Sequence, residues 1–212
     1  MHYSKAMLAR RSLAILFLIL PLAALTAQEA DETGGDEVSQ EVEVDRLELR
    51  SEEAATIEFE NFEGPQDVVS SDEEIRGIGR SLFQGLSLEP GGSADYFGRY
   101  ILFRGLDPAD PDGLDADVLS ITEDAAVNHI DNVRRIIAGY LNVAFGYGRA
   151  DADLIAELTT VYNAVHRGNM EFFSGRYKRI VAEYLDADRA GISTSYTDWP
   201  GATQLVIPLS SG

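Results

Sequence analysis

The sequence contains no cysteine. Disulfide bonds are therefore excluded, although an exported protein can form them, and the folded part must be stabilised by its core. A lipid anchor of the bacterial lipoprotein type is also excluded, because that anchor is attached to a cysteine at the cleavage site. Thiol nucleophiles are absent for the same reason, and no Gly-x-Ser-x-Gly motif of a serine hydrolase occurs.

Basic residues are scarce in this chain. It has 17 Lys and Arg against 36 Asp and Glu, which gives a net charge of −19. Nucleic acid binding requires basic side chains that displace phosphate counterions, so a nucleic acid partner is excluded. An anionic membrane surface would also repel the chain. The charge instead favours solubility and partners that are basic proteins or cations.

Only one long apolar run is present, and it lies at the N-terminus. Ser12–Ala24 is almost wholly apolar and follows a basic stretch that includes Arg10 and Arg11. A membrane-spanning helix needs about 20 apolar residues, which is more than this run provides. The basic stretch, the short run and the small Ala27 at a cleavage position predict a signal peptide over residues 1–27. The alternative is an uncleaved anchor in the inner membrane.

Cleavage would leave a chain with no further apolar run, so we expect a periplasmic or envelope-associated protein without an integral membrane span. Removal of three basic residues would lower the net charge from −19 to −22. Residues 28–53 are acidic and have too little apolar surface to offset the entropy of ordering. We interpret them as a flexible linker, with an acidic interaction tail as the alternative. Residues 54–209 are expected to form the globular domain and 210–212 a short tail.

Hydrophobic periodicity predicts the elements of this domain. They are, in order, a strand at Thr56–Phe62, a helix opened by a capping box of Ser71 and Glu74, strands at Tyr96–Phe103 and Asp117–Ile121, a helix from about Thr122 to Ala144, helices at Ala150–His166 and Met170–Leu185, and a strand at Gln204–Leu209. The order β-α-β-β-α-α-α-β predicts an α+β fold, a single compact domain with helices packed against a small mixed sheet. The short link between the last two helices predicts that they pack as antiparallel neighbours.

An acidic loop offers the best candidate for site chemistry. Calcium takes six to eight oxygen ligands, and a flexible acidic loop can supply them. An EF-hand register with Gly113 at its sixth position fails, because Pro108 and Leu119 occupy ligand positions. The alternative is an exposed turn that Asp and Pro favour. The candidate calcium ligands are the aspartates Asp107, Asp110, Asp112, Asp115 and Asp117.

Other chemical motifs are weaker. His129 and His166 lie on different predicted helices, whereas zinc needs three or four converging ligands, so we expect ordinary helix histidines. The segment 77–79 lacks the third glycine and the adjacent strand of a dinucleotide motif. A carboxylate pair could hydrolyse an envelope glycoside, but no pair stands out among so many acidic residues. We therefore predict no catalytic residue and no cofactor other than calcium.

Two aromatic residues near the C-terminus do not fit the apolar face of their helix. They are Phe172, beside the inward-facing Phe173, and Trp199 in the loop before the last strand. Exposed aromatics mark binding surfaces, which makes Phe172 and Trp199 candidates for partner binding. The alternative is that the loop tryptophan packs over a helix.

Seven segments together resemble a known family. The chain is similar to the N-terminal domain of the spirochaete eighty-three/one-hundred kilodalton antigen family, known from the Lyme-disease spirochaete, over roughly Val44–Leu209. The block Tyr-Asn-Ala-Val-x-Arg-Gly is the most specific. The segments are Phe62–Pro65, Ile75–Gly79, Tyr96–Tyr100, Arg134–Leu141, Ala152–Ala156, Val161–Gly168 and Trp199–Gln204.

The resemblance implies a cell-envelope protein with no established enzymatic activity, and it supplies no catalytic or binding residues. Family members continue into a long charged, helix-prone segment and a further C-terminal region, so the chain ending at Gly212 is expected to be a short member or a fragment. The leading hypothesis is a non-enzymatic interaction or structural module that contacts an envelope protein or cell-wall component. A calcium- or small-ligand-binding domain and an envelope hydrolase are the alternatives. Oligomeric state is not predicted.

Overall fold

The computed structural model describes residues 40–42, 54, 56–64 and 70–211. The strands are β1 (Gln40–Val42), β2 (Ser93–Tyr96), β3 (Tyr100–Gly105), β4 (Asp115–Ile121) and β5 (Thr203–Ser211). The helices are α2 (Asp72–Gly85), α3 (Ile130–Ala144), α4 (Arg149–Val165), α5 (Met170–Arg176) and α6 (Arg179–Tyr184), with a 3-10 turn η2 (Tyr196–Asp198).

The strands form one sheet in the order β1-β5-β4-β3-β2, and each neighbouring pair is antiparallel. This confirms the α+β class, and the elements follow the predicted order except that one predicted strand and one predicted helix are each divided in two. The sheet is antiparallel rather than mixed, because the chain turns back directly between β2, β3 and β4 and returns to β5 only after four helices.

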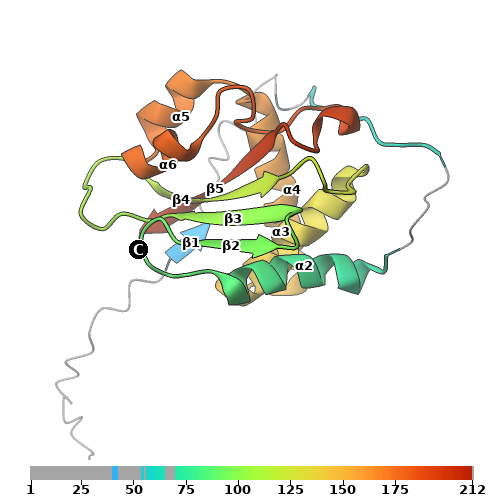
Figure 1. The fold of residues 1–212 in the computed structure, drawn as a ribbon, viewed down its shortest axis with the longest axis horizontal. Helices are drawn as coiled ribbons and strands as arrows, with labels where there is room; N and C mark the ends of the chain where they lie inside the picture. Colours follow the sequence, from blue (N-terminus) through green and yellow to red (C-terminus); the bar gives the residue numbers. More distant parts are fainter. Residues whose placement is uncertain (1–39, 43–53, 55, 65–69, 212) are drawn as a thin grey trace, which may run out of the picture. The chain divides into compact units, whose positions relative to one another are not determined.

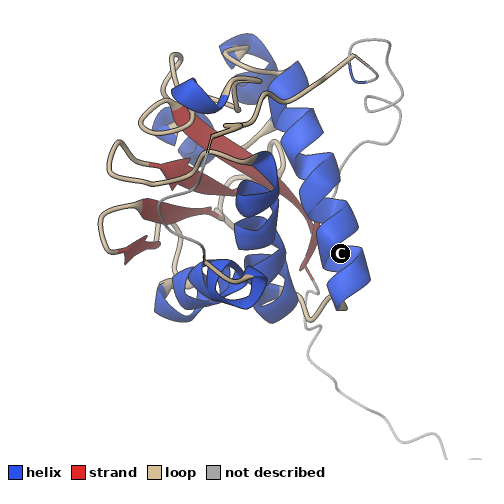
Figure 2. Ribbon diagram, turned by 90° about the vertical axis from the view of Figure 1, so that its right-hand side faces the viewer, coloured by secondary structure: helices blue, strands red, loops and turns tan. Residues whose placement is uncertain are grey.

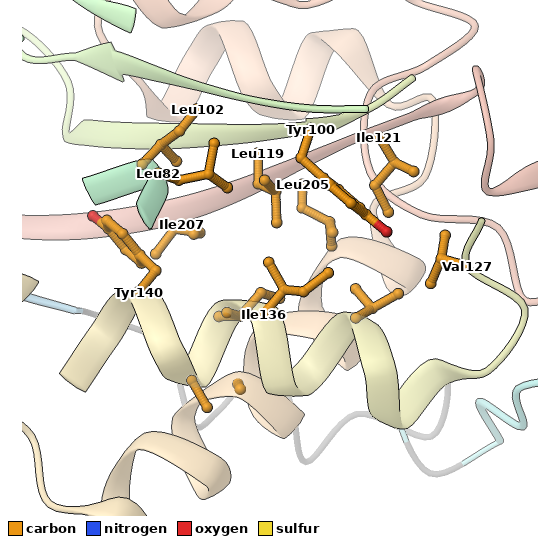
Figure 3. Packing of buried hydrophobic residues seen from close by; sticks show 14 of the residues in the cluster. Leu82, Tyr100, Leu102, Leu119, Ile121, Val127, Ile136, Tyr140, Leu205 and Ile207 are labelled. Atoms are coloured by element: carbon orange, nitrogen blue, oxygen red, sulfur yellow. The ribbon is translucent and has the colours of Figure 1, made fainter. Parts of the chain in front are cut away.

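Helices cover both faces of the sheet because the strand residues alternate between two cores. Leu119 and Leu205 face the core shared with α2 and α3, whereas Val118 and Val206 face the core shared with α5 and α6. Figure 1 shows α2 and α3 below the sheet and α5 and α6 above it, and Figure 2 shows the same layers from the side. In Figure 3, Ile136 of α3 points at the strands from below.

The outer edge of β5 is closed by side chains and loops. The Asn163 side chain of α4 accepts a hydrogen bond from the Val206 N–H at 2.7 Å and donates one to the Val206 C=O at 2.8 Å, as a paired strand would. Next to it, Gln204 N–H donates to the Arg189 C=O, and Gly191 N–H donates to the Gln204 C=O. Covering an edge in this way prevents unwanted strand pairing.

Several predicted boundaries were wrong. The first strand is Gln40–Val42, inside the predicted linker, and residues 56–62 form no strand but a single bridge from Glu60 to Ser195. The predicted strand at Tyr96–Phe103 is a hairpin of β2 and β3. The last predicted helix is divided into α5 and α6, and α4 packs mainly against α3 rather than as their antiparallel neighbour. The signal peptide and the rest of the predicted linker lie outside the described residues, and β5 extends into the predicted tail.

Candidate functional site

Asp117 of the acidic loop is an internal residue. It is fully buried, and its carboxylate accepts two hydrogen bonds from the Arg104 guanidinium, at 3.1 Å and 2.8 Å, and one from the Tyr140 hydroxyl. Burial alone would lower the pKa of Arg104, but the hydrogen bonds and charge of Asp117 outweigh burial and raise it. Burial and the charge of Asp117 both raise the pKa of Tyr140. The oxygens of Asp117 are therefore occupied inside the protein.

The other aspartates of this loop have separate roles. The buried Asp115 pairs with Lys178 at 2.9 Å and accepts a hydrogen bond from the Asp107 N–H. Asp107 and Asp110 each accept a hydrogen bond from a backbone N–H two residues ahead, which fixes a turn. Among the described residues, no three carboxylate or histidine side chains are grouped so that they could hold a metal ion. Calcium binding therefore stays a prediction without a preformed cluster.

The two aromatic candidates for partner binding lie in packed surroundings. Trp199 is fully buried, donates its indole N–H to the Ser193 C=O at 2.8 Å and contacts the edge of Phe59. Phe172 is half-buried and stacks on His166 with 3.5 Å between ring centroids. Trp199 thus serves the core, as the alternative interpretation held, and a partner would reach only part of Phe172.

A groove of about 1010 Å³ lies between the start of α2, the start of α3, the β2–β3 turn and η2. Such a volume is at the upper end of those found for ligand pockets. We call it the aromatic groove, because four aromatic side chains line it together with polar groups. Its lining includes Phe62, Glu74, Tyr96, Arg99, Tyr100, Asn128, His129, Asp131, Asn132, Arg135, Tyr196 and Thr197.

The segment 56–64 contributes Phe62 to the wall of the groove. Asn61 accepts a hydrogen bond from the Ile130 N–H at 2.8 Å, which satisfies a free amide at the start of α3. The Phe62 N–H donates to the Asn128 C=O, and the Phe62 ring packs edge-on against Tyr196 with 5.8 Å between centroids. The segment therefore adds the Phe62 ring to the groove beside Tyr196 of η2, through contacts distant in sequence.

Tyr100 forms the base of the groove on the sheet side. It is 5% exposed, and burial raises the pKa of its hydroxyl to about 12, with a smaller opposing effect of Arg99. The hydroxyl therefore stays protonated at physiological pH and can donate a hydrogen bond. Tyr96 packs beside it with 6.5 Å between ring centroids.

The charged groups of the groove differ in how they are paired. Glu74 accepts hydrogen bonds from Ser71, which hold its pKa below its usual value. Asp131 lies 3.6 Å from Arg134, and Arg135 pairs with Asp72 at 2.6 Å. The exposed Arg99 guanidinium has no hydrogen-bond or ion-pair partner within the part of the chain that the structure describes. In a chain with more than twice as many acidic as basic residues, this unpaired cation is notable.

The turn beside the groove holds an exposed phenylalanine in an unusual backbone conformation. Phe97 has φ 52° and Gly98 has φ 69°, and the Arg99 N–H donates to the Tyr96 C=O across the turn. Two positive φ angles identify a type I′ turn, in which asparagine and glycine are the preferred residues. Phe97 is nevertheless 81% exposed. A bulky residue at positive φ is a steric outlier, and such outliers occur at functional sites.

Sequence reasoning missed the groove and this turn. Tyr96, Phe97 and Tyr100 fit the composition of one continuous strand, and the only local sign of a turn was Gly98. The groove walls come from five separate parts of the chain, so no spacing within the sequence could have revealed them.

The chain was compared with known families, curated proteins and solved structures. The family model described as Borrelia P83/100 protein matches residues 47–212, which include every groove-lining residue. No curated protein and no solved structure matches the chain.

Proposed function

Because the chain belongs to the Borrelia P83/100 protein family, we propose that it is a non-enzymatic interaction module of the spirochaete cell envelope whose binding surface is the aromatic groove. Membership of this family is consistent with a surface or envelope protein. The observation that carries the proposal is the groove itself, a hollow lined by aromatic rings and polar groups beside an exposed phenylalanine.

The composition of the groove supports recognition. Aromatic side chains and arginine provide a large share of the binding energy at protein interfaces, and Tyr96, Arg99 and Tyr196 line this groove. Tyr100 adds a protonated hydroxyl, and Asn128 and Asn132 add amides that can both donate and accept. Polar groups placed among aromatic surfaces orient a partner, whereas the aromatic surfaces supply contact area.

The placement of carboxylates supports a non-enzymatic role. A glycoside hydrolase needs two carboxyl groups that face the same substrate, one of them protonated. The buried Asp115 and Asp117 are each paired with a cation, and neither lines the groove. Of the two carboxylates that line the groove, Glu74 has a lowered pKa, which disfavours the protonated acid, and Asp131 lies 3.6 Å from the cationic Arg134.

Export is the part of the proposal that rests on the sequence. The basic stretch and apolar run before Ala27 have the layout of a signal peptide, and we propose periplasmic or envelope location on that basis. No described helix has the length and hydrophobicity to cross a bilayer.

Photo-cross-linking in the native envelope tests the function. A photo-reactive amino acid replaces the exposed groove residue Thr197, and in a matched control it replaces the exposed Glu183 of α6 on the opposite face of the sheet. We expect a reproducible adduct from position 197 that position 183 does not give. Equal labelling at both positions, or turnover of cell-wall substrate by the purified chain, would refute the proposal.

A further inference from the structure

The two edges of the sheet are treated differently. The edge at β5 is closed by Asn163, the loop around Gly191 and β1, as described above. The other edge is β2, a strand of four residues with β3 as its only strand partner among the described residues. The hydrogen bond from the Arg104 N–H to the Gly92 C=O fixes which residues of β2 direct their backbone N–H and C=O groups toward β3. Because alternate residues of an antiparallel strand point toward the partner, the backbone groups of Ser93 and Asp95 point outward.

The free edge leads directly to the strained turn. Tyr96 ends β2, Phe97 follows it with its ring exposed, and the unpaired Arg99 completes the turn. Tyr96 and Phe97 pack edge-on with 4.8 Å between ring centroids, so they form one continuous aromatic surface. A backbone and a cation that lack partners among residues 40–42, 54, 56–64 and 70–211 therefore lie on either side of an apolar surface, all within the seven residues 93–99.

We propose that this hairpin binds an extended segment of a partner protein, which adds to β2 as a further strand. The segment places an apolar side chain on Phe97 and Tyr96 and a carboxylate on Arg99, and it bonds to the backbone of Ser93 and Asp95. Strand addition of this kind derives affinity from main-chain hydrogen bonds and specificity from side-chain contacts. The inference rests on the proposed interaction function and names its partner chemistry.

Charge distinguishes among possible occupants. Arg99 requires one carboxylate on the segment, but the net charge of −19 repels a strongly acidic one, so its other residues are apolar, neutral or basic. Two copies paired through β2 would bring their Asp95 side chains together and add two large negative charges, which disfavours a second copy. A partner protein with a mixed apolar and basic strand bearing one acidic residue fits best.

Selection from a random octapeptide library displayed on phage tests the binding chemistry. Peptides that bind the purified chain are expected to carry an acidic residue next to apolar ones. Their affinity should fall about tenfold or more with Arg99→Gln, and by a similar factor with Phe97→Ala. Arg179→Gln, at an exposed arginine on α6, is the matched control and should leave affinity unchanged. Selected peptides without an acidic residue, or with undiminished affinity for Arg99→Gln, would overturn the proposal.

Hydrogen exchange tests the binding geometry. The Ser93 and Asp95 amides should exchange quickly in the free chain and become protected with the selected peptide, whereas Ala94 and Tyr96 are protected already. Ser93→Pro removes an outward N–H without touching the ladder to β3, so it should weaken binding while Ala94 stays protected. A peptide that binds without protecting Ser93 and Asp95 would exclude strand addition.

The envelope experiment separates the two proposals. An adduct at position 197 that persists with Ser93→Pro and Arg99→Gln would leave the groove function standing and refute strand addition. Absence of any specific adduct at position 197 would refute the groove function itself.

Discussion

At the scale of single residues, Phe97 combines an unfavourable backbone with an unfavourable exposure. Left-handed backbone costs an ordinary residue about 1–2 kcal/mol, and a ring that is 81% exposed recovers little of that cost through burial. Sequences that are selected only for stability place asparagine or glycine in such a turn. Phenylalanine at φ 52° is therefore consistent with the partner contact proposed above, in which the ring is covered by a bound segment.

The substitution Phe97→Asn tests this trade-off. Because asparagine tolerates positive φ, we expect Phe97→Asn to raise the free energy of unfolding by about 0.5–1 kcal/mol while it weakens partner binding. Phe97→Ala is the control, since it removes the ring but keeps the strained backbone; it should lose binding without gaining stability. Urea unfolding measures both variants, and a less stable Phe97→Asn would contradict the account of strain.

Asp117, unlike the exposed Phe97, is a fully buried charge that is stabilised by its ion pair with Arg104. Asp117→Asn would leave the buried Arg104 without its counter-ion, which typically costs about 3–5 kcal/mol. The control Glu183→Gln breaks the exposed pair with Arg179 and should cost less than about 1 kcal/mol. Urea denaturation of both variants provides the comparison. Similar small losses would mean that Arg104 finds another partner or reaches water.

At the scale of elements, the contact between α2 and α3 depends on two glycines. A β-carbon on Gly79 would lie 1.9 Å from the Ile136 carbonyl oxygen, and one on Gly139 would lie 2.1 Å from the Arg76 carbonyl oxygen. Both distances are far below van der Waals contact with backbone atoms that cannot rotate away. The helices therefore approach each other through their backbones, which brings the start of α2 and the start of α3 together in the lining of the groove.

Gly79→Ala should consequently separate the helices and cost about 1–3 kcal/mol or more in the free energy of unfolding. Gly77→Ala lies in the same helix, but its β-carbon would meet only the flexible Arg80 side chain at 3.6 Å. The higher helix propensity of alanine should make that control neutral or stabilising by up to about 1 kcal/mol. Thermal unfolding measures the change in stability of both variants, and equal changes for Gly79→Ala and Gly77→Ala would exclude the close helix contact.

Local patterns predicted some elements well and others poorly, for identifiable reasons. The α2 start was correct because the capping box of Ser71 and Glu74 is a local interaction, and the structure contains both of its hydrogen bonds. The long helix predicted over residues 170–185 fails at Tyr177, where the Leu114 N–H donates to the Arg176 C=O and the Lys178 N–H donates to the Leu114 C=O. Those bonds come from more than 60 residues away along the chain, and nothing local signals them.

At the scale of the whole molecule, fold class could be predicted from local patterns, whereas the candidate site could not, because it is formed by contacts distant in sequence. The α+β class follows from counting elements in order, and it was predicted correctly. The groove requires segment 56–64, two helix ends, a hairpin turn and η2 to meet, so it depends on tertiary packing. Among the described residues the predicted calcium ligands form no preformed cluster, since Asp115 and Asp117 pair with cations from other elements, and calcium binding stays a prediction.

A molecule without disulfides depends on its core at every pH, and buried tyrosines make that core sensitive to alkali. Burial raises the pKa of Tyr100 to about 12 from its usual value near 10, and it raises the pKa values of Tyr140 and Tyr177 as well. Between about pH 10 and pH 12 the unfolded chain loses these protons while the folded chain keeps them. Proton binding is then greater in the folded state, so the free energy of unfolding must fall as pH rises through this window.

Tyr100→Phe isolates one contribution to this fall. A shift of about two pKa units corresponds to about 2–3 kcal/mol, so the variant should lose up to that much less stability than the parent between about pH 9 and pH 12. General repulsion within the acidic chain also grows with pH, but it acts on both proteins and cancels in the difference. Urea unfolding across the window measures the two slopes. Equal slopes would mean that the Tyr100 hydroxyl ionises as easily in the folded groove as in water.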